Sequence, residues 1–249
     1  MVDLEGSSHR SNPYVGSVSA FFPCYNDAPT IARMVTDAEE ALRRCVDDFE
    51  IIVVDDGSRD DSASVLSDLA CRVPRLRVVS HAHNQGYGAA LISGFAAATK
   101  EWIFYTDGDG QYDASDLDDL IRAVADDTDV VQGWKIARGD VWYRRVIGRA
   151  YHHTVRLLFD LRVRDTDCDY RLFRRSLLVT PPLRSSSGVI CVEMMRRFRT
   201  NGARIVEVPV RHSFRPAGRS QFFRLPAITR SALELMALWW RLMVLRRPA

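Results

Sequence analysis

Residues 102–111 read Trp-Ile-Phe-Tyr-Thr-Asp-Gly-Asp-Gly-Gln, an apolar run that changes abruptly into a glycine-rich acidic turn. The apolar part is typical of a buried strand, with the turn at its carboxyl end. Asp107 and Asp109 place two carboxylates one residue apart, and carboxylate oxygens are ligands that Mg²⁺ and Mn²⁺ prefer. A cation held there would bridge a diphosphate and neutralise its charge as it leaves. Gly108 has no side chain, so a diphosphate could approach the backbone closely.

Apolar strands followed by polar residues recur along the first half of the chain. We predict strands at residues 18–22, 50–54, 76–80, 102–106 and 129–132, alternating with helices near 29–45, 60–71, 87–99 and 115–126. Such alternation predicts an α/β fold with a mainly parallel sheet between helices, whose ligands bind beyond the carboxyl ends of the strands. Polar motifs follow four successive strands, at residues 23–27, 55–58, 84–88 and 107–111. We therefore expect them to form one site.

The second and third of these motifs suggest a nucleotide. Asp55 and Asp56 end a buried strand, where carboxylates can accept hydrogen bonds from a nucleobase or from ribose hydroxyls. Helix capping by Ser58 or Asp60 is the alternative explanation of this turn, but it does not require both aspartates. The small residues of the 84–88 turn would let a helix N-terminus approach a ligand or a neighbouring strand. This turn lacks the Gly-x-Gly-x-x-Gly pattern of dinucleotide folds.

The second half of the chain is less regular and ends in a strongly apolar helix. We predict helices at 141–159, 190–200 and 225–245, a short strand after the polar stretch 164–171, and a strand at 204–210. The charges of the last helix, Arg230, Glu234 and Arg241, fall in one narrow stripe. Because these charges interrupt it, we expect an amphipathic helix that lies in the membrane interface, anchored by Trp239 and Trp240, and does not span the bilayer. A core or dimer helix is the alternative.

Composition limits the class of protein. With 47% hydrophobic residues, the 249-residue chain can bury one large core, and we expect one domain after a flexible tail at residues 1–16. This tail lacks the apolar segment of a signal peptide, and the five cysteines include no Cys-x-x-Cys pair. We therefore expect a reducing, cytoplasmic setting without a zinc site or a disulfide framework. Residues 196–249 carry twelve arginines against two glutamates, which predicts a surface facing an anionic partner such as lipid headgroups.

Together these motifs resemble the family 2 glycosyltransferases, specifically the dolichol-phosphate mannosyltransferases and the bacterial polyprenyl-phosphate glycosyltransferases. The segments that carry the resemblance are Phe-Pro-Cys-Tyr-Asn-Asp (22–27), Glu-Ile-Ile-Val-Val-Asp-Asp-Gly-Ser (50–58), Asn-Gln-Gly-Tyr-Gly-Ala-Ala (84–90), Asp-Gly-Asp-Gly-Gln-Tyr-Asp (107–113) and Arg-Pro-Ala-Gly-Arg-Ser (215–220). The resemblance implies a GT-A fold over residues 17–222, with residues 223–249 as the C-terminal helix. It also implies a nucleoside-diphosphate sugar donor, Mg²⁺ or Mn²⁺, and inversion at the anomeric carbon.

The resemblance assigns roles to individual residues. The nucleoside pocket would be lined by Pro23, Tyr25, Asp27, Val54 and Asp56. The metal and the diphosphate would be held by Asp107, Asp109 and Gln111, with Gly108 between them and with Lys135 and Arg215 near the phosphates. Asp165 and Arg171 would lie near the acceptor. The chain departs from the family at Cys168 and Asp169, where glycine and a small residue are usual, and at Gln221, where the mannosyltransferases have lysine.

The leading interpretation is transfer of a hexose from a UDP- or GDP-sugar to a polyprenyl or dolichyl phosphate, by an enzyme peripherally bound to the inner face of the membrane. A lipid phosphate is already ionised near neutral pH and needs no strong base. The alternatives are a soluble enzyme that glycosylates a hydroxyl, with Asp165 as the candidate base, and a non-catalytic protein that binds nucleotides or lipid phosphates. Nucleic acid is not an expected partner, because the Trp-rich helix suits lipid better than bases. The sugar, the base, the acceptor and the oligomeric state stay open.

Overall fold

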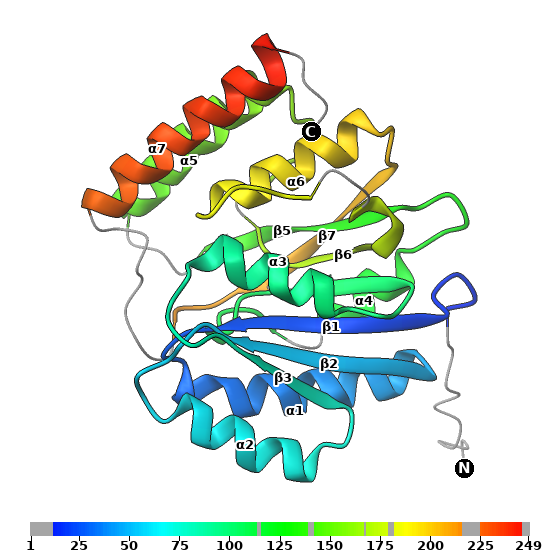
Figure 1. The fold of residues 1–249 in the computed structure, drawn as a ribbon. Coiled ribbons are helices and arrows are strands. Elements are labelled where there is room, and N and C mark those ends of the chain that lie inside the picture. Colours follow the sequence, from blue (N-terminus) through cyan, green and yellow to red (C-terminus); the bar gives the residue numbers. More distant parts are fainter. Residues whose placement is uncertain are drawn as a thin grey trace.

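The computed structural model describes residues 12–113, 116–138, 142–166, 168–178, 182–215 and 225–245, and only the backbone of 137, 138, 142–147 and 225–227. Its centre is a seven-stranded sheet with the order β3-β2-β1-β4-β6-β5-β7 (Figure 1). The strands are β1 (Ser17–Cys24), β2 (Asp48–Asp55), β3 (Leu76–Ser80), β4 (Trp102–Tyr105), β5 (Val130–Arg138), β6 (Arg171–Arg174) and β7 (Ile205–His212). All neighbouring pairs are parallel except those made by β6, which runs antiparallel to both β4 and β5.

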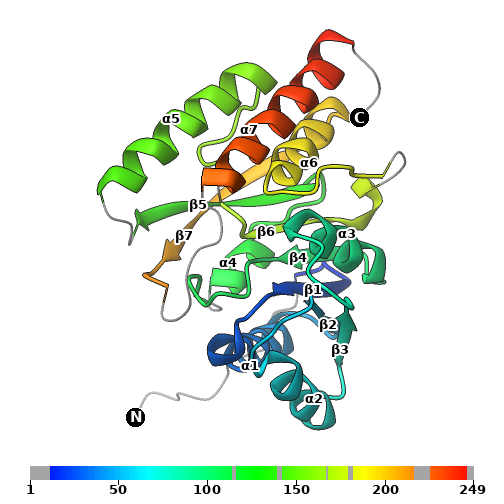
Figure 2. The ribbon, with the colours of Figure 1, turned by 60° about the vertical axis from the view of Figure 1, so that its left-hand side comes forward.

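Helices cover both faces of this sheet (Figures 1 and 2). They are α1 (Ala28–Cys45), α2 (Ser62–Arg72), α3 (Tyr87–Ala97), α4 (Asp116–Arg122), α5 (Trp142–Phe159), α6 (Val189–Thr200) and α7 (Leu225–Trp239). A 3₁₀ turn spans Arg175–Leu178, and a π-helical turn, Trp240–Val244, continues α7. The mainly parallel sheet flanked by helices and the C-terminal helix confirm the predicted fold class.

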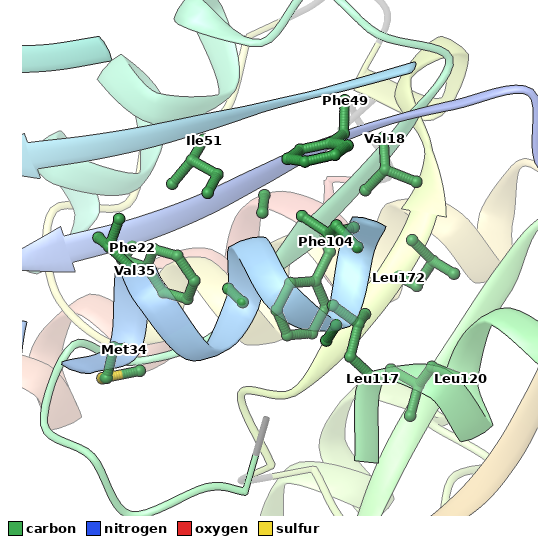
Figure 3. Packing of buried hydrophobic residues seen from close by; sticks show 14 of the residues in the cluster. Val18, Phe22, Met34, Val35, Phe49, Ile51, Phe104, Leu117, Leu120 and Leu172 are labelled. Atoms are coloured by element: carbon green, nitrogen blue, oxygen red, sulfur yellow. The ribbon is translucent and has the colours of Figure 1, made fainter. Parts of the chain in front are cut away.

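Successive residues of each strand point to opposite faces, which divides the core in two. Phe22 belongs to one cluster together with apolar residues of α1, α2 and α4 (Figure 3). Phe21, its neighbour on β1, belongs to the other cluster, which is formed with α3, α5, α6 and α7. Because both faces of the central strands are buried, these strands read as continuous apolar runs in the sequence. Most polar residues of this region therefore lie in the loops at the strand ends.

One predicted boundary is corrected. The flexible tail was expected to reach residue 16, but Asn12 donates its side-chain amide to the carbonyl oxygens of Ile121 (2.7 Å) and Val124 (2.9 Å). Val15 is buried in the first cluster. The described end of the tail is therefore packed on the domain, because the Val15 side chain and the Asn12 amide both find partners there. Residues 1–11 lie outside the described part of the chain.

Candidate functional site

The loops that follow β1, β2 and β4 are bonded to one another, so the polar motifs of the sequence do meet. The backbone N–H of Asn26 donates to Ser58 Oγ (3.0 Å), and the side-chain oxygen of Asn26 accepts from the N–H of Arg59 (2.7 Å). Thr30 Oγ1, in the first turn of α1, donates to the carbonyl oxygen of Gly108 (2.9 Å). These bonds fix the acidic turn after β4 against the start of α1.

Asp107 and Asp109 lie at the centre of this group. Tyr87 Oη donates to Asp107 Oδ1 (2.7 Å), and the N–H of Gln111 donates to Asp109 Oδ1 (3.1 Å). Burial raises the pKa of Asp107 well above its usual range, and the like charges of Asp169 and Asp109 raise it further. Burial also raises the pKa of Asp109, against the opposing charge of Arg215. The turn therefore concentrates negative charge that a divalent cation would relieve.

Arg215 brings a positive charge to this turn. Its Nη2 donates to Asp27 Oδ1 (2.7 Å), and its Nη1 lies 3.6 Å from Asp109 Oδ2. Burial raises the pKa of Asp27, although the hydrogen bond from the N–H of Tyr25 and the charge of Arg215 both act to lower it. Arg215 thus joins the motif after β1 to the motif after β4. The rest of its own motif, residues 216–220, and Gln221 lie outside the described residues.

Asp56, predicted to contact the nucleoside, organises the turn before α3. Its Oδ1 accepts from the N–H of Gln85 (2.9 Å) and contacts Nδ1 of His81 (2.6 Å), and its Oδ2 accepts from the N–H of Gly86 (2.9 Å). The other ring nitrogen of His81 lies 2.9 Å from Ser93 Oγ. The observed contacts make Asp56 an anchor of the loop, and a direct contact of Asp56 with a nucleoside stays a prediction.

Two other predicted residues act through the backbone. Val54 is fully buried, and its side chain is part of the second core cluster. Any contact of Val54 with a ligand would therefore be made by its backbone N–H or carbonyl group. A Cβ atom on Gly108 would lie 2.4 Å from the carbonyl oxygen of Pro23. Residue 108 must therefore be glycine to pack against the end of β1, whether or not a diphosphate approaches. Tyr25, in the loop between β1 and α1, is half-buried.

The residues expected near the acceptor are less accessible. Asp165 is 4% exposed, and its Oδ2 accepts from the N–H of Lys135 (3.4 Å). Lys135 itself lies close enough to Asp107 for its charge to lower the pKa of that carboxyl. Arg171 has no exposed surface. Its guanidinium donates to Gln132 Oε1 and Tyr105 Oη and pairs with Asp169 Oδ1 (3.3 Å), so it lies beneath the site and supports it.

Sequence reasoning missed Asp169 as a site residue. Tyr105 on β4 pairs with Arg171 on the antiparallel strand β6, and just beyond these strand ends the charge of Asp169 is near enough to raise the pKa of buried Asp107. Tyr105 Oη donates to Asp169 Oδ1 (3.3 Å), and the Asp169 side chain keeps 19% of its surface exposed. The available signal was an acidic residue just before a short strand, but the partner of that strand could not be read from the sequence. Asp169 thus adds a third carboxylate beside the acidic turn.

A metal would need further ligands at this site. Among the residues that the structure describes, no three or more His, Cys, Asp and Glu side chains are grouped so that they could hold an ion on their own. Mg²⁺ and Mn²⁺ sites that bind substrate phosphates commonly use one or two carboxylates and complete their shell with water and those phosphates. The arrangement of Asp107 and Asp109 is compatible with such a site.

Comparison with known proteins agrees with this geometry. Residues 19–180 match the family described as Glycosyl transferase family 2. The undecaprenyl-phosphate 4-deoxy-4-formamido-L-arabinose transferase of Enterobacter sp. (strain 638) is 28% identical over 210 residues, which are 84% of this chain and 63% of that protein. Glycosyltransferase AglD of Haloferax volcanii is 28% identical over 241 residues, 91% of this chain and 38% of that protein. The chain thus spans less than two thirds of the length of these relatives.

Solved structures extend the comparison to the fold. The glucosyl-3-phosphoglycerate synthase of Mycobacterium tuberculosis, in complex with Mn²⁺, UDP and glucosyl-3-phosphoglycerate, superposes with a TM-score of 0.68 at 19% identity. The superposition covers 90% of this chain and 79% of that one. At this identity the likeness concerns the architecture alone, and it confirms the expected GT-A arrangement. The family match covers most of the sheet and the acidic turn after β4, and the chain therefore belongs to glycosyl transferase family 2.

Proposed function

We propose that this chain is an inverting, metal-dependent glycosyltransferase that moves a hexose from a UDP- or GDP-sugar to a polyprenyl phosphate. The observation that carries the proposal is the pair Asp107 and Asp109, held beside Arg215 where the loops after β1 and β4 meet. A polyprenyl phosphate acceptor is supported by the name of the Enterobacter relative. A uridine nucleotide and Mn²⁺ or Mg²⁺ are supported by the complexes of the mycobacterial synthase.

The residues present fit a divalent cation. Asp107 and Asp109 offer hard oxygen ligands. Burial raises the pKa of each carboxyl, and a bound cation would stabilise the charged form. Gln111 donates its side-chain N–H to the carbonyl oxygen of Ser213 (3.0 Å), which fixes the amide group, and the amide oxygen is our candidate third ligand. A metal bound there would supply Lewis-acid stabilisation of the departing diphosphate.

The positively charged residues would share the task of charge neutralisation. Arg215 contacts Asp27 and Asp109, and Lys135 is near Asp107, so both cations border the place where a diphosphate would lie. Guanidinium groups bind phosphate oxygens in pairs, and such bonds are about twice as strong as neutral ones. We expect Arg215 to exchange its carboxylate partners for donor phosphates when the donor binds. This exchange would hold the leaving group in line with the attacking oxygen.

The state of Asp165 favours a phosphate acceptor. A general base must come within hydrogen-bond reach of the attacking hydroxyl, whereas a phosphate oxygen attacks without losing a proton. Asp165 is buried, and its carboxylate is engaged by the backbone of Lys135. This arrangement supports a lipid phosphate over a hydroxyl as the acceptor.

A lipid acceptor requires access to a membrane, for which α7 is our candidate. No helix within the described residues is long and apolar enough to span a bilayer. The charged stripe of α7 and its π-helical extension turns toward the domain, where Arg241 pairs with Glu193 of α6 (2.7 Å). Apolar side chains point outward, among them Leu233, which is 73% exposed, and Trp240, which is 56% exposed. Other apolar side chains of α7 are buried in the second core cluster, so the helix is apolar toward the core and toward the outside. We propose that the outer apolar face rests on the cytoplasmic leaflet.

The membrane proposal is tested by sedimentation with vesicles that contain anionic lipid. The parent protein should sediment with the vesicles, and the exchange of Leu233 and Trp240 for Glu should release it. The matched control is Tyr14→Glu, since Tyr14 is also exposed but lies just before β1. If the parent stays in solution with the vesicles, or if all three proteins sediment equally, α7 is not the membrane surface.

The reaction is tested by turnover of UDP-, GDP- and dTDP-hexoses with undecaprenyl phosphate, with Mn²⁺ or with excess chelator. We expect transfer to the lipid phosphate that stops when the metal is removed. Transfer only to a free hydroxyl acceptor would reject the lipid phosphate, and full activity in chelator would reject the metal mechanism. Nucleotide binding without transfer to any acceptor would reject both and favour a binding protein.

A further inference from the structure

The inward face of α7 is bonded to a loop that borders the candidate donor site. Glu234 Oε1 accepts from the N–H of Ser186, and its Oε2 accepts from the N–H of Ser187 (3.2 Å). One turn earlier on the same helix, Arg230 Nη2 donates to Ser186 Oγ (3.1 Å). A carboxylate that accepts two backbone N–H groups makes charge-assisted bonds, which are stronger than neutral ones. The position of the 185–187 loop is therefore set from α7.

The same loop presses on the first turn of α3. Ser186 accepts, through its carbonyl oxygen, the N–H of Gly88 (3.0 Å). A Cβ atom on Gly88 would lie 2.2 Å from the carbonyl oxygen of Ser185, so only glycine allows the two backbones to approach this closely. Gly86 is also near, because its Cβ would lie 3.1 Å from the carbonyl oxygen of Ser186. A shift of the loop must move the start of α3 with it.

Tyr87 stands between these two glycines and reaches the acidic turn. Its Oη donates to Asp107 Oδ1 (2.7 Å), so the backbone at 86–88 fixes which oxygen of Asp107 is engaged and where the carboxylate points. A chain of direct contacts therefore leads from Glu234, through Ser186 and Gly88, to Tyr87 and Asp107. Supporting side chains of this kind commonly decide how well a ligand is oriented, at a cost in affinity when they are lost.

We propose that Glu234 is a positioning residue of the donor site, which holds Asp107 in its metal-binding orientation through Ser186, Gly88 and Tyr87. This inference rests on the proposed function, since it takes Asp107 as a metal ligand. It makes α7, whose outer face is our candidate membrane surface, part of the support of the donor site as well. The competing explanation is that Glu234 merely satisfies two backbone N–H groups ahead of α6, which would affect stability alone.

The experiment measures Mn²⁺ binding, by electron paramagnetic resonance of the free ion, in the presence of UDP and separately of GDP. The variants are Glu234→Gln, Tyr87→Phe and the double variant. Glu234→Gln keeps the size of the side chain but turns an amide NH₂ group toward a backbone donor. The control is Arg199→Gln, which breaks a 2.7 Å ion pair with Asp160 at the end of α6 and leaves the loop untouched. The melting temperature of each protein is recorded beside its Kd for Mn²⁺.

We expect each single substitution at Glu234 and Tyr87 to raise the Kd for Mn²⁺ by about tenfold, and the double variant to be little worse than either, because residues in one network are not additive. The control should keep the parental Kd. A Glu234→Gln protein that melts earlier but binds Mn²⁺ as the parent does would overturn the proposal, and so would effects that add fully in the double variant.

Three further outcomes of the experiment have distinct consequences. If Glu234→Gln does not fold, Arg230→Gln perturbs the same loop from an exposed position, and it should raise the Kd by about twofold. An unchanged Kd in that variant would reject the proposal. If the parent fails to bind Mn²⁺ both in the presence of UDP and in the presence of GDP, the proposed function fails and this inference fails with it. If the parent binds and Glu234→Gln binds equally well, only the role of Glu234 is refuted.

Discussion

Asp56→Asn tests how the nucleoside side of the site is built. The carboxylate is buried and accepts two backbone N–H bonds of 2.9 Å, from Gln85 and Gly86, beside its contact with His81. An amide in its place keeps one accepting oxygen and turns an NH₂ group toward the second N–H donor. Leaving one buried N–H group without a partner costs about 1–3 kcal/mol, and weakening a charged bond to a neutral one adds about 1 kcal/mol. We therefore expect a loss of roughly 2–4 kcal/mol.

This loss can be measured against a matched control. Asp60 also accepts two backbone N–H bonds, from Ser62 (3.0 Å) and Ala28 (3.2 Å), but it is exposed, and water can replace them. In denaturant unfolding followed by fluorescence, Asp60→Asn should cost less than about 1 kcal/mol. Equal stability of the two variants would refute the role of Asp56 as a buried anchor.

The same variant tests the nucleotide assignment. Calorimetric titration of folded Asp56→Asn with UDP or GDP should show binding weaker by about 1–3 kcal/mol, the cost of a lost charged hydrogen bond and a loosened loop. A dissociation constant equal to that of the parent, in a protein that is still folded, would place the nucleoside elsewhere.

Three other substitutions address the acidic turn and the acceptor. Asp109→Asn should abolish turnover while the melting temperature stays close to that of the parent; normal activity in that variant would exclude Asp109 as a metal ligand. The pKa of Asp107 is raised on folding, so this group favours the folded state at acidic pH, and its contribution is lost as pH rises through the folded pKa. Asp107→Asn should therefore raise the melting temperature of the metal-free protein at neutral pH while it removes Mn²⁺ binding; an unchanged or lower melting temperature would show that the carboxylate is not destabilising. Asp165→Asn should slow transfer to a lipid phosphate without removing the dependence on a base, whereas with a hydroxyl acceptor the basic limb of the pH profile should disappear; full activity on every acceptor would make Asp165 structural.

Much of the donor site could be read from the sequence because its signals are local. The apolar run 102–106 and the turn after it identify a strand end from a few neighbouring residues, and the structure has a buried strand and an acidic turn there. The repeated order of strand and helix restricts the topology to a mainly parallel sheet. Each helix carries the chain back across the sheet, so the next strand runs in the same direction as the previous one. The predicted strand at 129–132 corresponds to the start of β5. The observed strand is longer than predicted and continues to Arg138, with a bulge after Lys135.

The orientation of distant side chains could not be read in this way. The family resemblance implied that Arg171 lies near the acceptor, yet its guanidinium is buried among Tyr105, Gln132 and Asp169. The charged stripe of α7 was visible from helical spacing, but spacing does not tell which side of a helix meets the domain. The contacts of Glu234 with the 185–187 loop decided that.

By itself, the sequence determined the fold class and placed Asp107 and Asp109 in a turn after a buried strand, because strand periodicity and turn chemistry act over a few residues. Only the tertiary structure decided that the charge of Asp169 acts on Asp107, since this depends on β6 entering the sheet antiparallel to β4, about seventy residues away along the chain. It likewise decided that the charged stripe of α7 meets the domain, where Glu234 accepts two backbone N–H groups and Arg241 pairs with Glu193. Such non-local choices follow from the packing of the whole core, which no short stretch of sequence encodes.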